Sequence, residues 1–190
     1  ACGAGQTARL SAKFDLEATP TGGGFSVEMW VKFADLASGQ TLFDSRDAAG
    51  NGFACQTTDR GTVQLSLRGA FGGPGRENAV LTETSWDCDP GLLRPGGWHH
   101  LVAIIDGGAK IISFVVDGQL CDGGTSRPFG WAKFSRDLRM IPTTKTLRVA
   151  PSLHGELGRV RLYGRRLNVS EAVGNWRAGR GATTTAIPGK

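Results

Sequence analysis

Residues 25–33 read Phe-Ser-Val-Glu-Met-Trp-Val-Lys-Phe, so an apolar side chain occupies every second position from Phe25 to Phe33. An extended strand points successive side chains to opposite faces of a sheet. These alternate residues therefore share one face, whereas a helix would scatter them around its circumference. The stretch predicts a β-strand with one face packed against an apolar core.

Other short segments carry the same signature, because they are rich in branched and aromatic residues and are separated by Gly, Asp and Asn. The pair Gly107-Gly108 joins two of these segments and is typical of a hairpin turn. Strands are predicted over 41–44, 52–58, 62–68, 79–86, 98–106, 110–116, 146–150 and 156–163.

Helical spacing of apolar residues is found late in the chain, over 168–176, where Asn168 is a candidate N-cap. The stretch 125–144 is too apolar for a linker, and we expect an ordered loop folded over one sheet. The sequence thus predicts an all-β fold, a two-sheet antiparallel β-sandwich (jelly roll) with one short C-terminal helix. A single domain over 1–180 and a flexible tail or linker over 181–190 are expected.

The formal net charge is +5, and the basic residues are spread over most of the 190-residue chain. A nucleic-acid-binding domain usually gathers its positive charge on one face and carries a recognisable motif, which this sequence lacks. No apolar run approaches the roughly 20 residues of a membrane-spanning helix. We therefore expect neither nucleic acid nor membrane as a partner.

Four cysteines are present, without the spacing of a zinc site. Cys88 and Cys121 each stand where a predicted strand runs into a loop, which favours a Cys88–Cys121 disulfide, with Cys2–Cys55 as the second pair. Two disulfides would indicate an oxidising compartment. The alternative is that these residues are free buried thiols.

Three stretches together resemble the laminin-G-like branch of the concanavalin A-like lectin/glucanase superfamily. The first is Phe-Ser-Val-Glu-Met-Trp-Val-Lys at 25–32. The second is Gly-Trp-His-His-Leu-Val-Ala at 97–103, followed by Phe-Val-Val-Asp-Gly at 114–118. The third is Gly-Glu-Leu-Gly-Arg-Val-Arg-Leu-Tyr at 155–163, followed by Arg166-Leu167. Each motif alone is common, but their occurrence in this order supports the fold.

The resemblance implies a jelly roll of a kind often appended to secreted glycan-degrading enzymes or adhesive proteins. By analogy we expect a non-catalytic carbohydrate-binding module in a secreted, periplasmic or extracellular protein, with a poly- or oligosaccharide as its partner. A catalytic domain in the same parent chain is the second expected partner. Two alternatives remain open: a structural accessory domain that packs on a catalytic domain, and an extracellular protein-adhesion module.

Catalysis is not predicted. Glucanases of this superfamily place their acids on one strand as Glu-x-Asp-x-(x)-Glu, so that period-two spacing directs the carboxylates into one cleft. That pattern is absent, and its nearest approximation, Glu83 with Asp87 and Asp89, runs into a turn at Cys88 and Pro90.

Sugar binding needs an aromatic ring to cover the C–H face of a saccharide and polar groups to bind its hydroxyls. Two segments, around Trp86 and around Trp131, have this composition, and residues 44–47 form a third, polar cluster at a strand end. We hypothesise that the three segments converge at one rim or on the concave sheet. Three alternatives remain open. Each Trp could anchor a loop over the core, and Asp87 and Asp89 could cap a turn. Arg46 could be a plain surface residue or a partner of Asp44 or Asp47. The predicted ligand-binding residues are Trp86, Asp87, Asp89, Arg127, Trp131, Asp44 and Arg46.

Relatives of this type often hold one structural calcium ion near a sheet edge, through carboxylate and backbone oxygens. By resemblance, Glu156 is a candidate ligand and Asp15 a candidate partner from the start of the chain. The chain departs from the family pattern here, because Gly158 and Arg159 stand where acidic residues are common.

Overall fold

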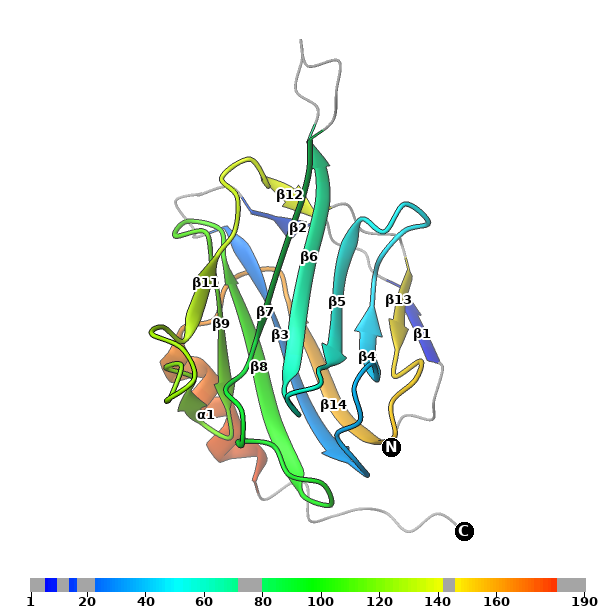
Figure 1. Cartoon of the computed structure of the whole chain (residues 1–190), viewed down its shortest axis with the longest axis vertical. Coiled ribbons are helices and arrows are strands. Elements are labelled where there is room, and N and C mark those ends of the chain that lie inside the picture. The colour runs from blue at the N-terminus through cyan, green and yellow to red at the C-terminus, as the bar shows by residue number, and fades with distance from the viewer. Residues whose placement is uncertain (1–5, 10–13, 17–22, 72–79, 142–145, 181–190) are drawn as a thin grey trace.

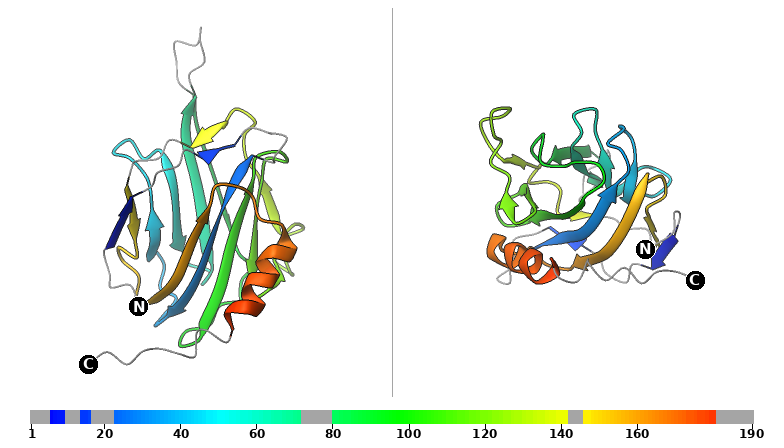
Figure 2. Two further views of the ribbon diagram at one scale, coloured as in Figure 1. Left: turned by 180° about the vertical axis from the view of Figure 1, so that it is seen from behind. Right: turned by 90° about the horizontal axis from the view of Figure 1, so that it is seen from below.

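The computed structural model describes residues 6–9, 14–16, 23–71, 80–141 and 146–180. Two antiparallel sheets pack face to face, and the helix α1 (Val169–Gly179) lies on the outside of one of them (Figures 1 and 2). This arrangement confirms the predicted β-sandwich with one short C-terminal helix.

The first sheet has the strand order β1-β13-β4-β5-β6-β7 within the described residues. Its strands are β1 (Gln6–Arg9), β13 (Thr146–Val149), β4 (Thr41–Asp44), β5 (Gly52–Thr57), β6 (Val63–Phe71) and β7 (Val80–Asp87).

The second sheet has the order β10-β9-β8-β3-β14, and β11 also pairs with β9. Its strands are β10 (Gln119–Leu120), β9 (Ile111–Val116), β8 (Trp98–Asp106), β3 (Gly24–Phe33), β14 (Gly155–Tyr163) and β11 (Trp131–Lys133). A separate two-stranded ribbon pairs β2 (Phe14–Asp15) with β12 (Met140–Ile141).

The core lies between the two sheets, and the apolar face of β3 supplies one wall of it. Phe25 packs on Phe14 and Phe53 at ring-centroid distances of 4.6 and 5.0 Å, and Phe43 reaches Phe53 at 5.8 Å. All four rings are buried, and each contributes roughly 1.5–3 kcal/mol by leaving water. The strand at 25–33 therefore packs one face against the apolar core, as its alternation predicted.

The opposite face of β3 is covered as well, because α1 packs over it. Ser26, Glu28 and Trp30 are buried on this side. A Cβ atom on Gly179 would lie 2.5 Å from the Trp30 ring, so the last turn of the helix can approach the ring only because residue 179 is glycine.

The predicted hairpin is confirmed, with Ile105 of β8 opposite Ile112 of β9. The stretch 125–144 is ordered where it is described, but it forms β11 beside β9 of the second sheet and β12 of the two-stranded ribbon, and its Phe134 and Leu138 pack into the core. The predicted tail at 181–190 lies outside the described residues. Within the described part of the chain, no helix has both the length and the apolar character needed to cross a bilayer.

Candidate functional site

Polar side chains gather on the outer face of the first sheet because its strands alternate. On β6, Leu65 and Leu67 are buried in the core, so Ser66 and Arg68 between and beyond them point outward. The same rule turns Arg148 of β13 outward. Pairing of β6 with β7 then sets Glu83 directly opposite Arg68.

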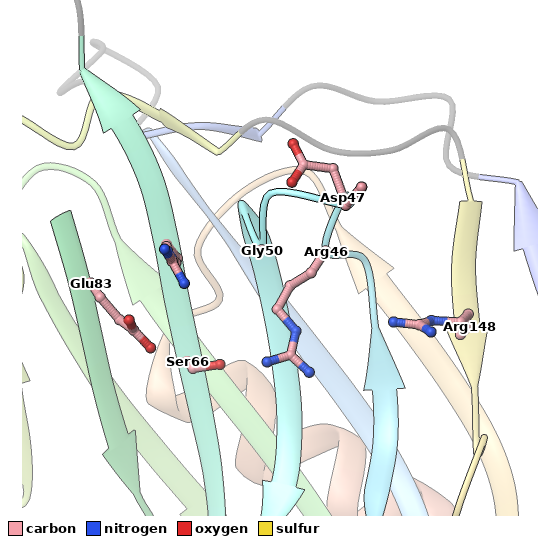
Figure 3. Close-up of a pocket in the computed structure, with 8 residues that line it drawn as sticks. Arg46, Asp47, Gly50, Ser66, Glu83 and Arg148 are labelled. Carbon is pink, nitrogen blue, oxygen red and sulfur yellow. The ribbon is translucent and has the colours of Figure 1, made fainter. Parts of the chain in front are cut away.

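These outward residues surround a pocket of about 250 Å³, which we call the arginine pocket. Figure 3 shows the side chains of Arg46, Arg148 and Glu83 extending toward one another around Ser66, whereas the carboxylate of Asp47 points away from them. The residues that line the pocket are Arg46, Asp47, Ala48, Gly50, Ser66, Arg68, Glu83 and Arg148.

Asp44 holds two of the three arginines in place from beneath. Arg46 donates to it through Nε and Nη2, both at 2.9 Å, and Arg148 donates through Nη2 at 2.6 Å. Burial alone would raise the pKa of Asp44, but the hydrogen bonds and charge of Arg46, with the charge of Arg148, lower it. Asp44 therefore stays ionised and shares one negative charge between two guanidinium groups.

Arg46 begins the loop between β4 and β5, and a tight turn sets its position. Asp47 closes that turn, because its Oδ1 accepts the backbone N–H groups of Ala49 and Asn51, both at 2.9 Å. Hydrogen bonds to Asp44 raise the pKa of Arg46, and the negative charge of Glu83 adds to this effect. The alternative interpretation of Arg46, a partner of Asp44, is therefore correct, although the residue also lines the pocket.

Arg68 and Glu83 differ from Arg46, Arg148 and Asp47, whose side chains are bonded within the protein. Neither side chain makes a hydrogen bond or ion pair with any residue that the structure describes. Gly50 leaves space for Arg68, since a Cβ atom there would lie 3.1 Å from its Nη1. The pocket thus contains one guanidinium and one carboxylate that are available to a ligand.

The second predicted cluster is a buried structural network. Arg127 donates to Asp87 Oδ1 at 2.9 Å and to Asp89 Oδ1 at 2.8 Å, and its guanidinium lies 3.9 Å from the centroid of the Trp86 ring. Asp87 and Asp89 are only 2% and 8% exposed. The prediction that these three residues and Trp86 bind sugar is therefore corrected: both carboxylates are already bonded within the protein, and the one Arg127 nitrogen without a partner among the described residues, Nε, is buried.

The remaining contacts of this network fix the loop that follows β10. Asp89 Oδ2 accepts the backbone N–H groups of Asp122 and Gly123 at 3.0 and 3.1 Å, and Trp86 Nε1 donates to the carbonyl of Gly130 at 3.2 Å. On its other side Asp87 accepts two bonds from Arg60 Nη2, at 2.7 and 2.6 Å. Trp86 thus has the alternative role of a loop anchor, and Asp89 that of an acid that fixes a turn. Asp87 caps no turn in the described structure, because its carboxylate accepts only from side chains.

Trp131 stands apart from that network. It is 38% exposed and lies beside Phe129, which is 55% exposed, at a ring-centroid distance of 5.1 Å. None of the residues in the buried network lines the arginine pocket, and neither does Trp131. The three predicted segments therefore do not converge: Arg46 lines the pocket, Asp44 lies buried beneath it, and the other five residues lie elsewhere.

The predicted calcium pair does not form one site. Glu156 lies opposite Lys32, near the end of β3, and its carboxylate pairs with the Lys32 ammonium at 3.1 Å. Asp15 belongs to β2, which lies near the other end of β3, on the order of 25 Å away by strand length (Figure 1). Within the described residues, no three His, Cys, Asp or Glu side chains are grouped so that they could hold a metal ion. These residues do not fit a calcium site.

The cysteines also differ from the first prediction. Cys55, Cys88 and Cys121 are free, buried thiols, so the predicted Cys88–Cys121 disulfide is not formed. The Cys88 sulfur accepts a hydrogen bond from the backbone of Val63 at 3.3 Å, and burial raises the pKa of Cys88 and of Cys121 to about 12. They pack as small apolar residues in the core. Cys2, the predicted partner of Cys55, lies outside the described residues.

The three family motifs meet at one buried carboxylate, which sequence reasoning did not identify. Glu28 of the first motif accepts hydrogen bonds from Arg161 at 3.0 Å, Tyr163 at 2.6 Å and Asn175 of α1 at 2.8 Å, and His100 Nε2 lies 3.2 Å away. Burial would raise the pKa of Glu28, but the bonds from His100 and Tyr163 and the charges of His100 and Arg161 lower it to about 2. The network fastens the helix to the second sheet.

Solved structures of similar fold include a sialidase CBM40 and laminin LG domains. The CBM40 of the IT-sialidase of Ruminococcus gnavus superposes with a TM-score of 0.57 at 15% identity, covering 91% of this chain and 96% of that one. The same module bound to α2,3-sialyllactose gives 0.57 at 16% identity, with the same coverage. Domains LG4-5 of the mouse laminin α1 chain give 0.57 at 12% identity, covering 88% of this chain and 41% of that one.

At these identities the likeness extends to the fold alone. No protein of curated function matches the chain by sequence. The sequence does match a family model over residues 4–172, which spans the three motifs around Glu28 and all strands of the outer-face pocket. With the two-sheet architecture, this match shows that the chain belongs to the concanavalin A-like lectin/glucanases superfamily.

Proposed function

We propose that this chain is a non-catalytic carbohydrate-binding module and that its ligand occupies the arginine pocket. One observation carries the proposal: the outer face of the first sheet holds a pocket in which Arg68 and Glu83 make no hydrogen bond or ion pair within the described structure. Polar groups left available in this way are suited to the closely spaced hydroxyls of a sugar, which both donate and accept.

The similar solved structures support this class of ligand. The CBM40 of a sialidase, which has the same fold, binds sialyllactose. The family to which the chain belongs is itself described by lectins and glucanases. Attachment to a catalytic domain in a secreted parent protein is part of the proposal, as expected from the sequence.

The spacing of acids supports binding rather than hydrolysis. Glu83 and Asp87 both point outward from β7, but four residues of strand separate them by about 13 Å. Glycosidases hold their two carboxyl groups roughly 5–9.5 Å apart. Asp87 is also paired with Arg60 and Arg127, so it is not available as an acid or base.

An adhesion module is the second candidate, favoured by the exposed Phe129–Trp131 pair. Exposed aromatic residues are enriched in protein-binding surfaces. Capture of a protein partner that depends on Trp131 and not on the arginine pocket would favour this function.

A glycan array followed by titration calorimetry tests the proposal. Ser66→Tyr places a ring on the floor of the pocket, and we expect it to abolish binding of any glycan that the native chain retains. Ser126→Tyr is the control, since Ser126 is exposed in the loop next to Phe129. If Ser66→Tyr binds as well as the native chain, or if no glycan is retained, the proposal is wrong.

A further inference from the structure

The positive and negative side chains around the ligand space of the arginine pocket do not cancel one another. Asp44 neutralises one of the two guanidinium groups that it holds, so the group of Asp44, Arg46 and Arg148 keeps one net positive charge. Arg68 adds a second, and Glu83 opposes it with one negative charge. Asp47 keeps its negative charge, but its carboxylate bonds its own turn and points away from the arginines. The side chains that extend toward one another around Ser66, together with Asp44 beneath them, therefore carry one net positive charge.

From this imbalance we infer that the ligand is an acidic saccharide residue whose carboxylate binds the Arg68 guanidinium. The inference rests on the proposed function and names the substrate class of the same pocket. A planar guanidinium presents paired N–H donors that match a carboxylate, and such charge-assisted bonds are stronger than bonds between neutral groups. A neutral saccharide would leave Arg68 with Glu83 alone as a counter-charge, and Glu83 forms no ion pair with it.

The neighbouring arginines strengthen this preference. Arg46 uses Nε and Nη2 on Asp44, and Arg148 uses Nη2, so each keeps N–H groups that Asp44 does not occupy. Arg148 is 55% exposed at its side chain and Arg46 33%. Both can therefore donate to an anion seated on Arg68.

Glu83 and Ser66 indicate a sugar rather than a simple anion. A carboxylate accepts hydrogen bonds and donates none, so Glu83 suits hydroxyl groups of a ligand whose acid lies on Arg68. The charge of Glu83 also repels a ligand that brings several negative charges. The pocket is thus matched to one carboxylate with hydroxyls beside it, which is the chemistry of a sialic acid or of a hexuronic acid.

The size of the pocket limits what it holds. Its volume of about 250 Å³ lies below the roughly 300–1,000 Å³ of pockets for drug-sized ligands. It accommodates one sugar ring rather than several. We therefore infer that the pocket takes a single acidic residue, at a chain end or on a branch.

Calorimetry with matched ligand pairs tests this inference. Sialyllactose is compared with lactose, and an oligosaccharide with a terminal glucuronic acid is compared with its glucose counterpart. We expect one acidic ligand of these pairs to bind and its neutral counterpart to bind roughly 10- to 100-fold more weakly, which is the range for loss of a charge-assisted bond. Whether the sialyl or the glucuronyl ligand binds identifies the source of the carboxylate. Acetate is expected to bind more weakly than either.

Arg68→Gln should reduce the affinity for the acidic ligand by a similar factor. Arg159→Gln is the matched control, because it removes the same charge from an exposed position on β14 and should leave the affinity unchanged. Equal loss in both variants would mean a non-specific charge effect and would overturn the inference.

The failures of the two proposals are distinguishable. If neutral glycans bind as tightly as acidic ones, and Ser66→Tyr still abolishes binding, the acidic ligand is wrong while saccharide binding at the pocket stands. If sulfated glycans bind better than carboxylated ones, the preference for one carboxylate is wrong.

Discussion

Replacing Arg127 by methionine distinguishes a structural network from a binding site at the Trp86 cluster. Methionine keeps an apolar stem against the Trp86 ring but removes the charge that lies between Asp87 and Asp89. Three hydrogen bonds are lost, namely two to side-chain oxygens and one to the backbone carbonyl of Asp87 at 3.0 Å. The variant therefore tests the charge rather than the packing.

The expected cost follows from the partners that remain. Removing one member of a buried ion pair costs about 3–5 kcal/mol, because the other charge is left uncompensated. Asp87 keeps its bonds from Arg60 and Thr62, and Asp89 keeps two backbone N–H donors. We therefore expect the lower end, a loss of about 3 kcal/mol in the free energy of unfolding.

Urea unfolding measures this loss. For a slope of about 2 kcal/mol per molar urea, the midpoint should fall by about 1.5 M, and Tm should fall by about 6–12 °C. Arg159→Met, at an exposed position, should stay within about 0.5 kcal/mol of the native chain. Glycan affinity should not change once the variant is folded. A stable Arg127→Met with weakened glycan binding would refute the structural role and restore these residues to the ligand site.

Further outcomes follow from other contacts. The pKa of Glu28 is lowered to about 2 from an ordinary 4.5, which contributes about 3 kcal/mol of stability above pH 4.5. This stability is lost as the pH falls toward 2. In Glu28→Gln, the free energy of unfolding measured in urea should therefore depend less on pH over this range. Trp86→Ala should cost about 3 kcal/mol in a thermal melt, whereas Trp131→Ala should change stability by less than about 1 kcal/mol and leave pocket binding intact, since only the former ring carries a buried polar network. In a Cys2→Ser variant, Ellman's reagent should react only after unfolding, because the described thiols are buried and free; they belong to Cys55, Cys88 and Cys121.

The strands and the hairpin could be predicted because their signals are local. Alternation at 25–33 and the Gly107-Gly108 turn depend on neighbouring residues alone. The covered second face of β3 could not be predicted in the same way, since it depends on α1, which begins more than a hundred residues later. The three family motifs indicated the fold but not why the second face of β3 is buried. The reason lies in the contacts of Glu28 with β8, β14 and α1.

The Trp86 cluster was misread because its composition serves two purposes equally well. An aromatic ring with two acids and an arginine describes a sugar site, and it equally describes a buried ion network. The choice between them depends on Arg127, which lies 40 residues from Asp87 in the chain and reaches it only through the fold of the intervening loop. Composition gives no sign of whether an acid already has its partner.

Of the residues that line the arginine pocket, only Arg46 was predicted, because those on the strands meet it through the pairing of strands that are distant in sequence. Asp44 and Arg46 are near neighbours in sequence, but Arg148 joins Asp44 across 104 residues, and Arg68 meets Glu83 only through the register of β6 and β7. These residues stand on strand faces whose inward neighbours hold the core, so their side chains can change while the fold is kept. Ligand specificity in this chain is therefore expected to depend on a few outward strand positions, and substitutions there should alter binding with little cost in stability.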